Sequence, residues 1–172
     1  GPNYFVIADG FSGTPTIPTE LNFWFLAKSM ERNGGVLHYD GQQGVDMDVF
    51  VHTPKAFKPH TDKYGHQCQQ YGALFKWDKT RFPGGKLWEE QMLLRLKQEP
   101  GKSYMTVLYP RLKQDDPPAS YKRIADHVVQ VTTGLSNDTV LMAAHPFSFK
   151  GAAVTFRGRA GAVRRYRDKK VV

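Results

Sequence analysis

The feature that most restricts the fold is a series of short β-type segments, rich in branched and aromatic residues and separated by turn signals. Segment 45–51 is the clearest, because valine and methionine occupy one parity while aspartate and phenylalanine occupy the other. A period of two puts these two sets on opposite faces of a strand. The preceding Asn33-Gly34-Gly35 supplies residues that tolerate a positive φ in a tight turn. Segment 45–51 therefore predicts a half-buried antiparallel strand.

Similar segments follow one another along the chain. The others are 4–8, 21–27, 36–39, 87–97, 104–109, 128–133, 139–144, 153–157 and 162–166. Segment 21–27 is apolar at both parities, which predicts a central strand covered on both faces, with Trp24 in the core. Segment 87–97 also contains good helix formers, so a helix is the alternative there. Its alternation favours a strand, which Pro100-Gly101 would connect to 104–109 as a hairpin. Segments 153–157 and 162–166 are expected to form a basic terminal pair.

Residues 1–172 are expected to form one all-β domain, an antiparallel β-sandwich of the jelly-roll type. The length suits a single domain, and 16 glycines with 11 prolines supply the frequent turns. Segment 52–85 has no periodicity but holds too many aromatic residues for a disordered segment, so one long ordered surface loop is expected there. The chain opens in the middle of a strand-like segment, as expected of a piece of a longer protein. Gly1-Pro2 fits either a cloning scar or native sequence.

The formal charge of +8 favours an anionic partner, which charge alone does not identify. The sequence has no nucleic-acid fold signature and no apolar run of about 18–20 residues, so neither nucleic acid nor a membrane is an expected partner. Seven of the last sixteen residues are basic, and Arg164, Arg165 and Arg167 are candidates for binding carboxylates or sulfates. The alternative is an edge strand whose charges prevent aggregation.

The long segment combines aromatic side chains with amides and cations, and this mixture suits sugars. Aromatic faces pack on sugar rings, while guanidinium and amide groups bind hydroxyl, carboxylate or sulfate groups. The candidate ligand-binding residues in and beside this segment are Tyr64, Tyr71, Trp77, Arg81 and Trp88. The alternative is that the aromatic residues only hold the segment against the sheet.

The same segment contains four residues of types that bind zinc, namely His52, His60, His66 and Cys68. Their spacing matches no paired metal motif, so ordinary loop histidines are favoured and no metal or other cofactor is expected. Because Cys68 is the one cysteine, the chain forms no internal disulfide.

No catalytic group is assigned. Asp46 and Asp48 share one strand face without a recognisable third group, so they are expected to be solvated. Nucleophile elbow, phosphate-loop and dinucleotide motifs are absent from the sequence. The domain is therefore not expected to be an enzyme on its own.

Four segments of the chain resemble structural segments of heparinase II/III-like polysaccharide lyases. They are 1–13, 21–27, 41–49 and 107–113. The resemblance implies a large parent enzyme in which an α/α-barrel precedes β-sandwich layers and which cleaves uronic-acid polysaccharides by β-elimination. The chain has no helical barrel and no H-x-H-x-D-type segment, so no catalytic residue is carried over. What the resemblance implies for this chain is the downstream β portion only.

The leading expectation is a non-catalytic carbohydrate-binding module that binds an acidic polysaccharide. A glycosaminoglycan such as chondroitin sulfate or hyaluronan comes first and alginate second. The partners would be this glycan and an upstream catalytic barrel of the same parent chain, in a bacterial secreted or periplasmic setting. The alternative is a domain that completes a lyase active site together with the missing barrel, and a third is a purely structural domain.

Overall fold

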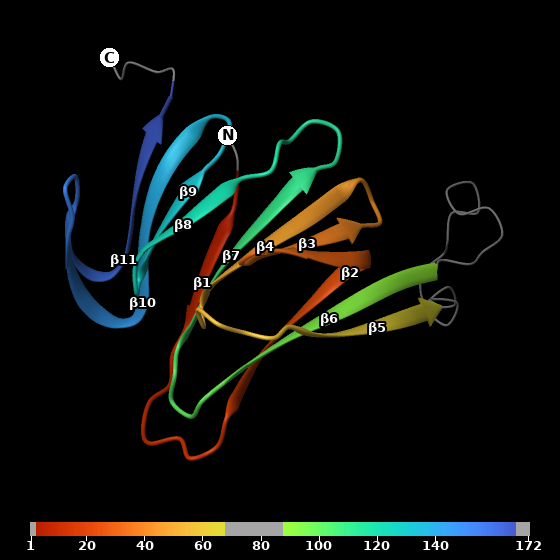
Figure 1. The fold of residues 1–172 in the computed structure, drawn as a ribbon, viewed down its shortest axis with the longest axis horizontal. Coiled ribbons are helices and arrows are strands. Elements are labelled where there is room, and N and C mark those ends of the chain that lie inside the picture. Colours follow the sequence, from red (N-terminus) through yellow and green to blue (C-terminus); the bar gives the residue numbers. More distant parts are fainter. Residues whose placement is uncertain (1–2, 68–87, 168–172) are drawn as a thin grey trace, which may run out of the picture.

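A computed structural model of the chain describes residues 3–67 and 88–167, except the side chains of 64–67 and 88–90. All regular secondary structure in these residues is β-strand, as Figure 1 shows. The strands are β1 (Phe5–Asp9), β2 (Thr19–Asn33), β3 (Val36–Gly41), β4 (Val45–Thr53), β5 (His60–Gln67), β6 (Trp88–Gln98), β7 (Tyr104–Leu112), β8 (Ser120–Ala125), β9 (Val128–Thr132), β10 (Ser136–Lys150) and β11 (Thr155–Tyr166). No described residue belongs to a helix with the length and hydropathy of a membrane span.

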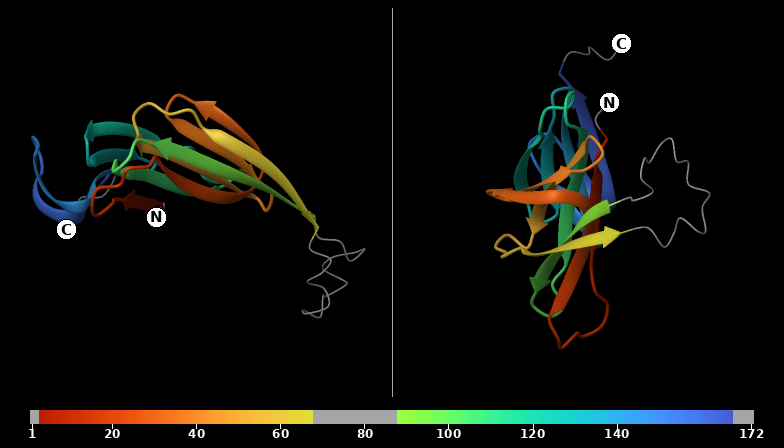
Figure 2. Two further views of the ribbon diagram at one scale, coloured as in Figure 1. Left: turned by 90° about the horizontal axis from the view of Figure 1, so that it is seen from below. Right: turned by 90° about the vertical axis from the view of Figure 1, so that its right-hand side faces the viewer.

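The strands form two antiparallel sheets that pack on each other (Figures 1 and 2). The larger sheet has the order β1-β7-β4-β3-β2-β6-β5, and the smaller sheet has the order β11-β10-β9-β8. Strand β2 takes part in two halves of the larger sheet, because residues 19–26 pair with β6 and residues 27–33 pair with β3. A register shift between Ala27 and Ser29 lies where the two halves meet.

The first hydrophobic core joins side chains from both halves of the larger sheet. Leu94 and Leu96 of β6 lie in one buried cluster with Leu37 of β3 and Val49 and Val51 of β4. Each such aliphatic side chain stabilises the fold by roughly 1.5–3 kcal/mol when it leaves water. Side chains of β2 and β6 therefore pack on one face of β3 and β4.

The second core lies on the other face of β4 and β7. Phe50 and Val107 pack there against Val129 and Val131 of β9. The ring of Phe50 stacks on that of Tyr121 of β8, with centroids 4.9 Å apart. Strands β4 and β7 thus have buried side chains on both faces, which makes them the middle layer of the sandwich.

The structure confirms the predicted antiparallel β-sandwich and several of its elements. Segment 87–97 is a strand, β6, and the helix alternative is wrong. Asn33 pairs with Val36 across a two-residue turn in which Gly34 has a φ of 59°. Part of the expected long loop is strand β5, while residues 68–87 lie outside the described part of the chain.

Other expectations are wrong for reasons of tertiary packing. Segment 21–27 is not covered on both faces, because its side chains alternate and Trp24 is 56% exposed. Segment 45–51 is buried on both faces instead of one. Pro100-Gly101 is a turn, but β6 pairs with β2 and β5, and β7 pairs with β1 and β4. The basic residues 155–166 form one strand, β11, which pairs with β10 instead of folding on itself.

Candidate functional site

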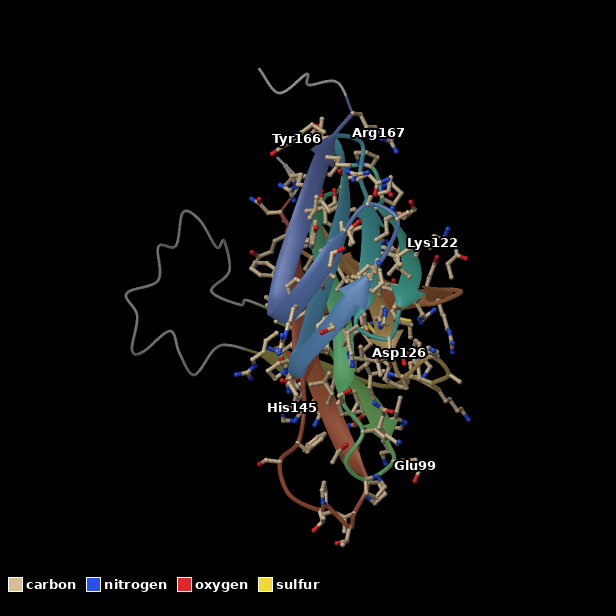
Figure 3. All side chains as sticks on the ribbon, turned by 90° about the vertical axis from the view of Figure 1, so that its left-hand side faces the viewer. Glu99, Lys122, Asp126, His145, Tyr166 and Arg167 are labelled. Atoms are coloured by element: carbon tan, nitrogen blue, oxygen red, sulfur yellow. The ribbon has the colours of Figure 1, made fainter. Side chains whose placement is uncertain are left out.

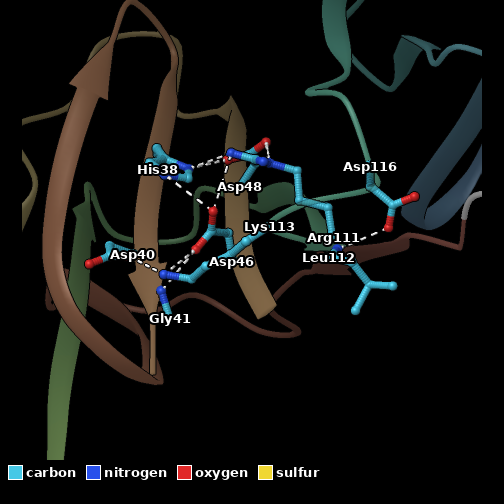
Figure 4. Close-up of polar contacts among 9 residues, drawn as sticks. All are labelled: His38, Asp40, Gly41, Asp46, Asp48, Arg111, Leu112, Lys113 and Asp116. Carbon is cyan, nitrogen blue, oxygen red and sulfur yellow. Dashed lines mark hydrogen bonds and ion pairs between the residues drawn. The ribbon is translucent and has the colours of Figure 1, made fainter. Parts of the chain in front are cut away.

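Sheet geometry brings five charged or titratable side chains together at one end of the middle layer. His38 stands opposite Asp48 in the β3–β4 pairing, and Asp46 stands opposite Arg111 in the β4–β7 pairing. Lys113 follows β7 directly. We call His38, Asp46, Asp48, Arg111 and Lys113 the ion cluster (Figure 4).

The ion cluster neutralises two buried carboxylates. Asp46 and Asp48 are only 6% and 3% exposed. Arg111 Nε donates a hydrogen bond to Asp48 Oδ2 at 3.1 Å, and Arg111 Nη2 lies 3.5 Å from Asp46 Oδ2. His38 Nδ1 is 2.6 Å from Asp48 Oδ1. The expectation that these aspartates are solvated is therefore wrong, because a buried carboxylate needs such partners.

Asp46 also fixes the turn between β3 and β4. Its Oδ1 accepts a hydrogen bond from the backbone N–H of Gly41 at 3.1 Å and lies 3.2 Å from Lys113 Nζ. Lys113 additionally donates to Asp40, and this hydrogen bond holds the pKa of the Asp40 carboxyl below its ordinary value. The backbone N–H of Lys113 donates to the carbonyl of Gly44 at 3.1 Å. The turn at 42–44 is thus tied to β4 and to the end of β7.

A groove of about 350 Å³ lies beside this turn, and we call it the Trp24 groove. Trp24 and Leu26 of β2 form one part of its lining, and Gln42 and Gln43 of the β3–β4 turn form another. Asp46 contributes to the same lining. The groove therefore combines a large exposed indole with two amides on a turn that the ion cluster holds in place.

A larger cavity of about 690 Å³ adjoins the Trp24 groove, with Val45 in the lining of both. Leu112 and Leu135 contribute apolar surface, and Asp115 and Asp116 contribute carboxylates. Arg111 adds a cation to this lining, and the Trp24 groove also has a carboxylate, so charge does not separate the two sites. The Trp24 groove differs by its exposed indole.

A cleft of about 310 Å³ lies on the other side of the ion cluster. His38, Asp48 and Arg111 line it together with Arg32 and Pro118. Arg32 is held by its own contacts, since its Nε donates to the carbonyl of Gly34 at 3.0 Å. An imidazole, a guanidinium and a carboxylate thus meet at one solvent-accessible position.

The three arginines expected to bind anions do not form one row. Arg164 is engaged by a buried carboxylate, since its guanidinium donates to Asp138 at 2.7 and 2.9 Å. Arg165 is paired in register with Asn137, so its side chain lies on the opposite face of β11. Arg167 follows the strand, and its backbone N–H donates to the carbonyl of Leu135. All three arginines are exposed, but Arg164 is the one paired with a buried aspartate.

Arg164 stabilises a buried charge. Asp138 is 1% exposed and also accepts a hydrogen bond from the hydroxyl of Tyr4 at 2.6 Å. Burial by itself would raise the pKa of Asp138, but the hydrogen bonds from Arg164 and Tyr4 outweigh it and lower that pKa. Burial in turn raises the pKa of Tyr4. Asp138 of β10 is therefore bound to β11 through Arg164 and to Tyr4, the residue that precedes β1.

The candidates in the long segment are not tested by the structure. Tyr71, Trp77, Arg81 and Cys68 lie outside the described residues. Tyr64 and Trp88 lie on β5 and β6, opposite Gln91 and Gln67, but their side chains are outside the description, as is that of His66. These assignments remain predictions.

Two histidines of the hypothetical zinc set are described. His52 is buried, with Nε2 3.2 Å from the carbonyl oxygen of Val128, and burial lowers its pKa. His60 Nε2 lies 3.1 Å from Asp62 Oδ1. Among the described side chains, which exclude those of 64–67 and 88–90, no three His, Cys, Asp or Glu residues come together as a metal site.

Sequence reasoning missed Trp24, His38 and Arg111 as site residues. His38 and Arg111 are 73 positions apart, and only the strand order reveals that both flank β4. The chain has no match among known protein families, curated proteins or solved structures.

Proposed function

We propose that this domain is a non-catalytic carbohydrate-binding module for an acidic polysaccharide, a glycosaminoglycan first and alginate second. The observation that carries the proposal is the exposed indole of Trp24 in a groove that also holds the amides of Gln42 and Gln43. An indole face packs on the C–H groups of a sugar ring, and amides exchange hydrogen bonds with its hydroxyls.

Rigidity of the groove supports the proposal. The turn at 42–44 is held by Asp46, Lys113 and their backbone partners before any ligand arrives. A preformed wall loses less conformational entropy on binding than a flexible loop. The net charge of +8 favours the approach of a polyanion over that of a neutral glycan.

The resemblance to polysaccharide lyases also supports this proposal, because three of the resembling segments contain residues of the groove and the ion cluster. Of the four segments that carry it, 21–27 contains Trp24, 41–49 contains the turn with Asp46 and Asp48, and 107–113 contains Arg111 and Lys113. Three separate segments therefore converge on one groove and its supporting ion cluster. The parent would be a secreted or periplasmic bacterial lyase whose upstream barrel performs the cleavage.

A second candidate function rests on the cleft lined by His38, Asp48 and Arg111. β-Elimination of a uronate needs a base for the proton α to the carboxylate and a cation for the charge that develops. An imidazole and a guanidinium at one accessible position suit these two roles. In this reading, the domain completes a lyase active site together with a barrel.

Affinity electrophoresis of the full chain tests the first proposal. Chondroitin sulfate, hyaluronan and alginate in the gel should retard the protein, whereas a neutral glucan should not. Trp24→Ala should weaken retardation by tenfold or more in dissociation constant, about 1.4 kcal/mol or more. Phe5→Ala, which removes another exposed aromatic ring, is the matched control and should change nothing. Equal retardation of the two variants, or none with any glycan, would contradict the proposal.

The second candidate has its own measurement. The isolated domain and the domain mixed with a barrel are incubated with uronic-acid glycans, and absorbance of the unsaturated product is followed. Product that appears only with the barrel and disappears in Arg111→Lys would favour the second candidate. Product from the domain alone would overturn the non-catalytic assignment.

A further inference from the structure

A separate cavity lies at the opposite end of β1 from Tyr4. It has a volume of about 290 Å³, is open to solvent, and is bordered by the end of β1, the β6–β7 turn, the β8–β9 turn and an irregular part of β10. We call it the histidine cavity. Its lining includes Phe11, Lys102, Ser103, His127, His145 and Phe147.

The irregular part of β10 builds one wall of the histidine cavity. The β10–β11 pairing is interrupted between Met142 and Phe147, so residues 143–146 leave the ladder. Such irregularities re-aim side chains and often stand beside functional sites. Figure 3 shows His145 at this position, on the face turned toward the viewer.

The opposite walls are closely fitted to this irregular part. A Cβ atom at Gly10 would overlap the Cβ of Ala144, so glycine is needed for β10 to approach the end of β1. The carbonyl of His127 accepts a hydrogen bond from the backbone N–H of Met142 at 2.9 Å. The His127 and Phe147 rings lie with centroids 5.1 Å apart. The cavity is therefore shaped by packing contacts instead of loose loops.

The chemistry of the lining suits an anion attached to a sugar ring. Lys102 supplies an ammonium group, His127 and His145 supply imidazoles, and Ser103 supplies a hydroxyl. Among the described residues that line the cavity, none carries a carboxylate. The nearby Asp126 is paired with Lys55 at 2.9 Å. Phe11 and Phe147 add two aromatic rings, which can pack on a sugar face.

We infer that the histidine cavity binds a single acidic sugar unit, a ring that bears a carboxylate or a sulfate. This inference rests on the proposed glycan-binding function and adds a second contact point, far along the chain from Trp24, that selects the charged sugar. Ligand pockets range from about 300 to 1,000 Å³, so a cavity at the lower limit fits one ring and not an oligosaccharide. Lys102 would pair with the acidic group, while the imidazoles and Ser103 would hydrogen-bond to it and to ring hydroxyls.

Histidine NMR of the full chain tests the inference. Sodium glucuronate, glucose and sodium sulfate are titrated at constant ionic strength while the Cε1–Hε1 resonances are followed, with assignments from His127→Gln and His145→Gln. Glucuronate should shift the His127 and His145 signals in a saturable manner, and glucose should not. If sulfate alone gives the same shifts with the same affinity as glucuronate, the sugar ring contributes nothing and the inference is overturned.

Two lysine variants provide the matched comparison. Lys102→Gln should weaken glucuronate binding at least fivefold, whereas Lys122→Gln, which removes an exposed charge on β8, should leave it unchanged. Equal affinity of the two variants would refute the role of the cavity. Trp24→Ala separates the two proposals, because it should leave the glucuronate shifts intact even if the Trp24 groove binds no glycan.

Discussion

Replacing Arg164 by methionine removes the cation that neutralises Asp138 but preserves much of the apolar stem of the side chain. Breaking a buried ion pair from one side costs about 3–5 kcal/mol because the remaining charge stays in a medium of low polarity. The Arg164 side chain is 34% exposed, so water screens part of this interaction. We therefore expect Arg164→Met to lower the free energy of unfolding by about 2–3 kcal/mol.

Urea unfolding followed by tryptophan fluorescence measures this loss. With a slope of about 2 kcal/mol per molar urea, the midpoint should fall by roughly 1–1.5 M. Arg165→Met is the control, because Arg165 is an exposed neighbour on the other face of β11, and it should change stability by less than about 0.5 kcal/mol.

A double variant tests the physical reason. Asp138→Asn combined with Arg164→Met removes the buried charge and keeps an acceptor for the Tyr4 hydroxyl, so it should be at least about 1 kcal/mol more stable than Arg164→Met alone. A double variant that is less stable than Arg164→Met, or an Arg164→Met protein as stable as the control, would show that Asp138 is not held by this pair.

Three further predictions concern other parts of the fold. Asp46→Asn should weaken glycan retardation and lower stability together, because the turn at 42–44 loses the charged acceptor that holds Gly41 and Lys113; unchanged affinity in a stably folded variant would argue against a preformed groove. Gly10→Ala should cost about 1–3 kcal/mol by overlap with Ala144 and should abolish the glucuronate shifts, as urea unfolding and NMR would report. Burial lowers the pKa of His52. The His52 imidazole therefore binds a proton near pH 6.5 in the unfolded chain but not in the folded chain. Stability should therefore decline as the pH falls below about 6.5. A His52→Gln variant with the same decline between pH 6.5 and 5 would rule out this source.

The sequence predicted what depends on local pattern. The alternation in 45–51, the branched and aromatic residues of 104–109, and the glycines after Asn33 are properties of a few consecutive residues. Strand β8 was missed because Ser120–Ala125 carries no run of apolar residues, although Tyr121 and Arg123 both pack on Phe50 across the second core.

The site depended on information that no single segment contains. Segment 21–27 is apolar enough for a central strand, but no layer formed by the described residues covers Trp24. The acidic face of 45–51 is buried because Arg111, some 63 residues after Asp48, pairs with it across β4 and β7. Neither the exposure of Trp24 nor the pairing of Arg111 with Asp48 can be predicted before the strand order is known.

The two-part pairing of β2 also has a consequence for the order in which the chain is made. The first half of β2 is synthesised well before its partner strand, because Leu21 pairs with Leu96 and Phe23 with Leu94. At about 5–20 residues per second, some 75 residues of further synthesis leave this aromatic strand without its partner for roughly 4–15 s. Tyr4 remains without its hydrogen-bond partner for longer, because Asp138 lies 134 residues downstream. The yield of folded domain should therefore depend more on translation speed and chaperone access than on the final stability of the fold.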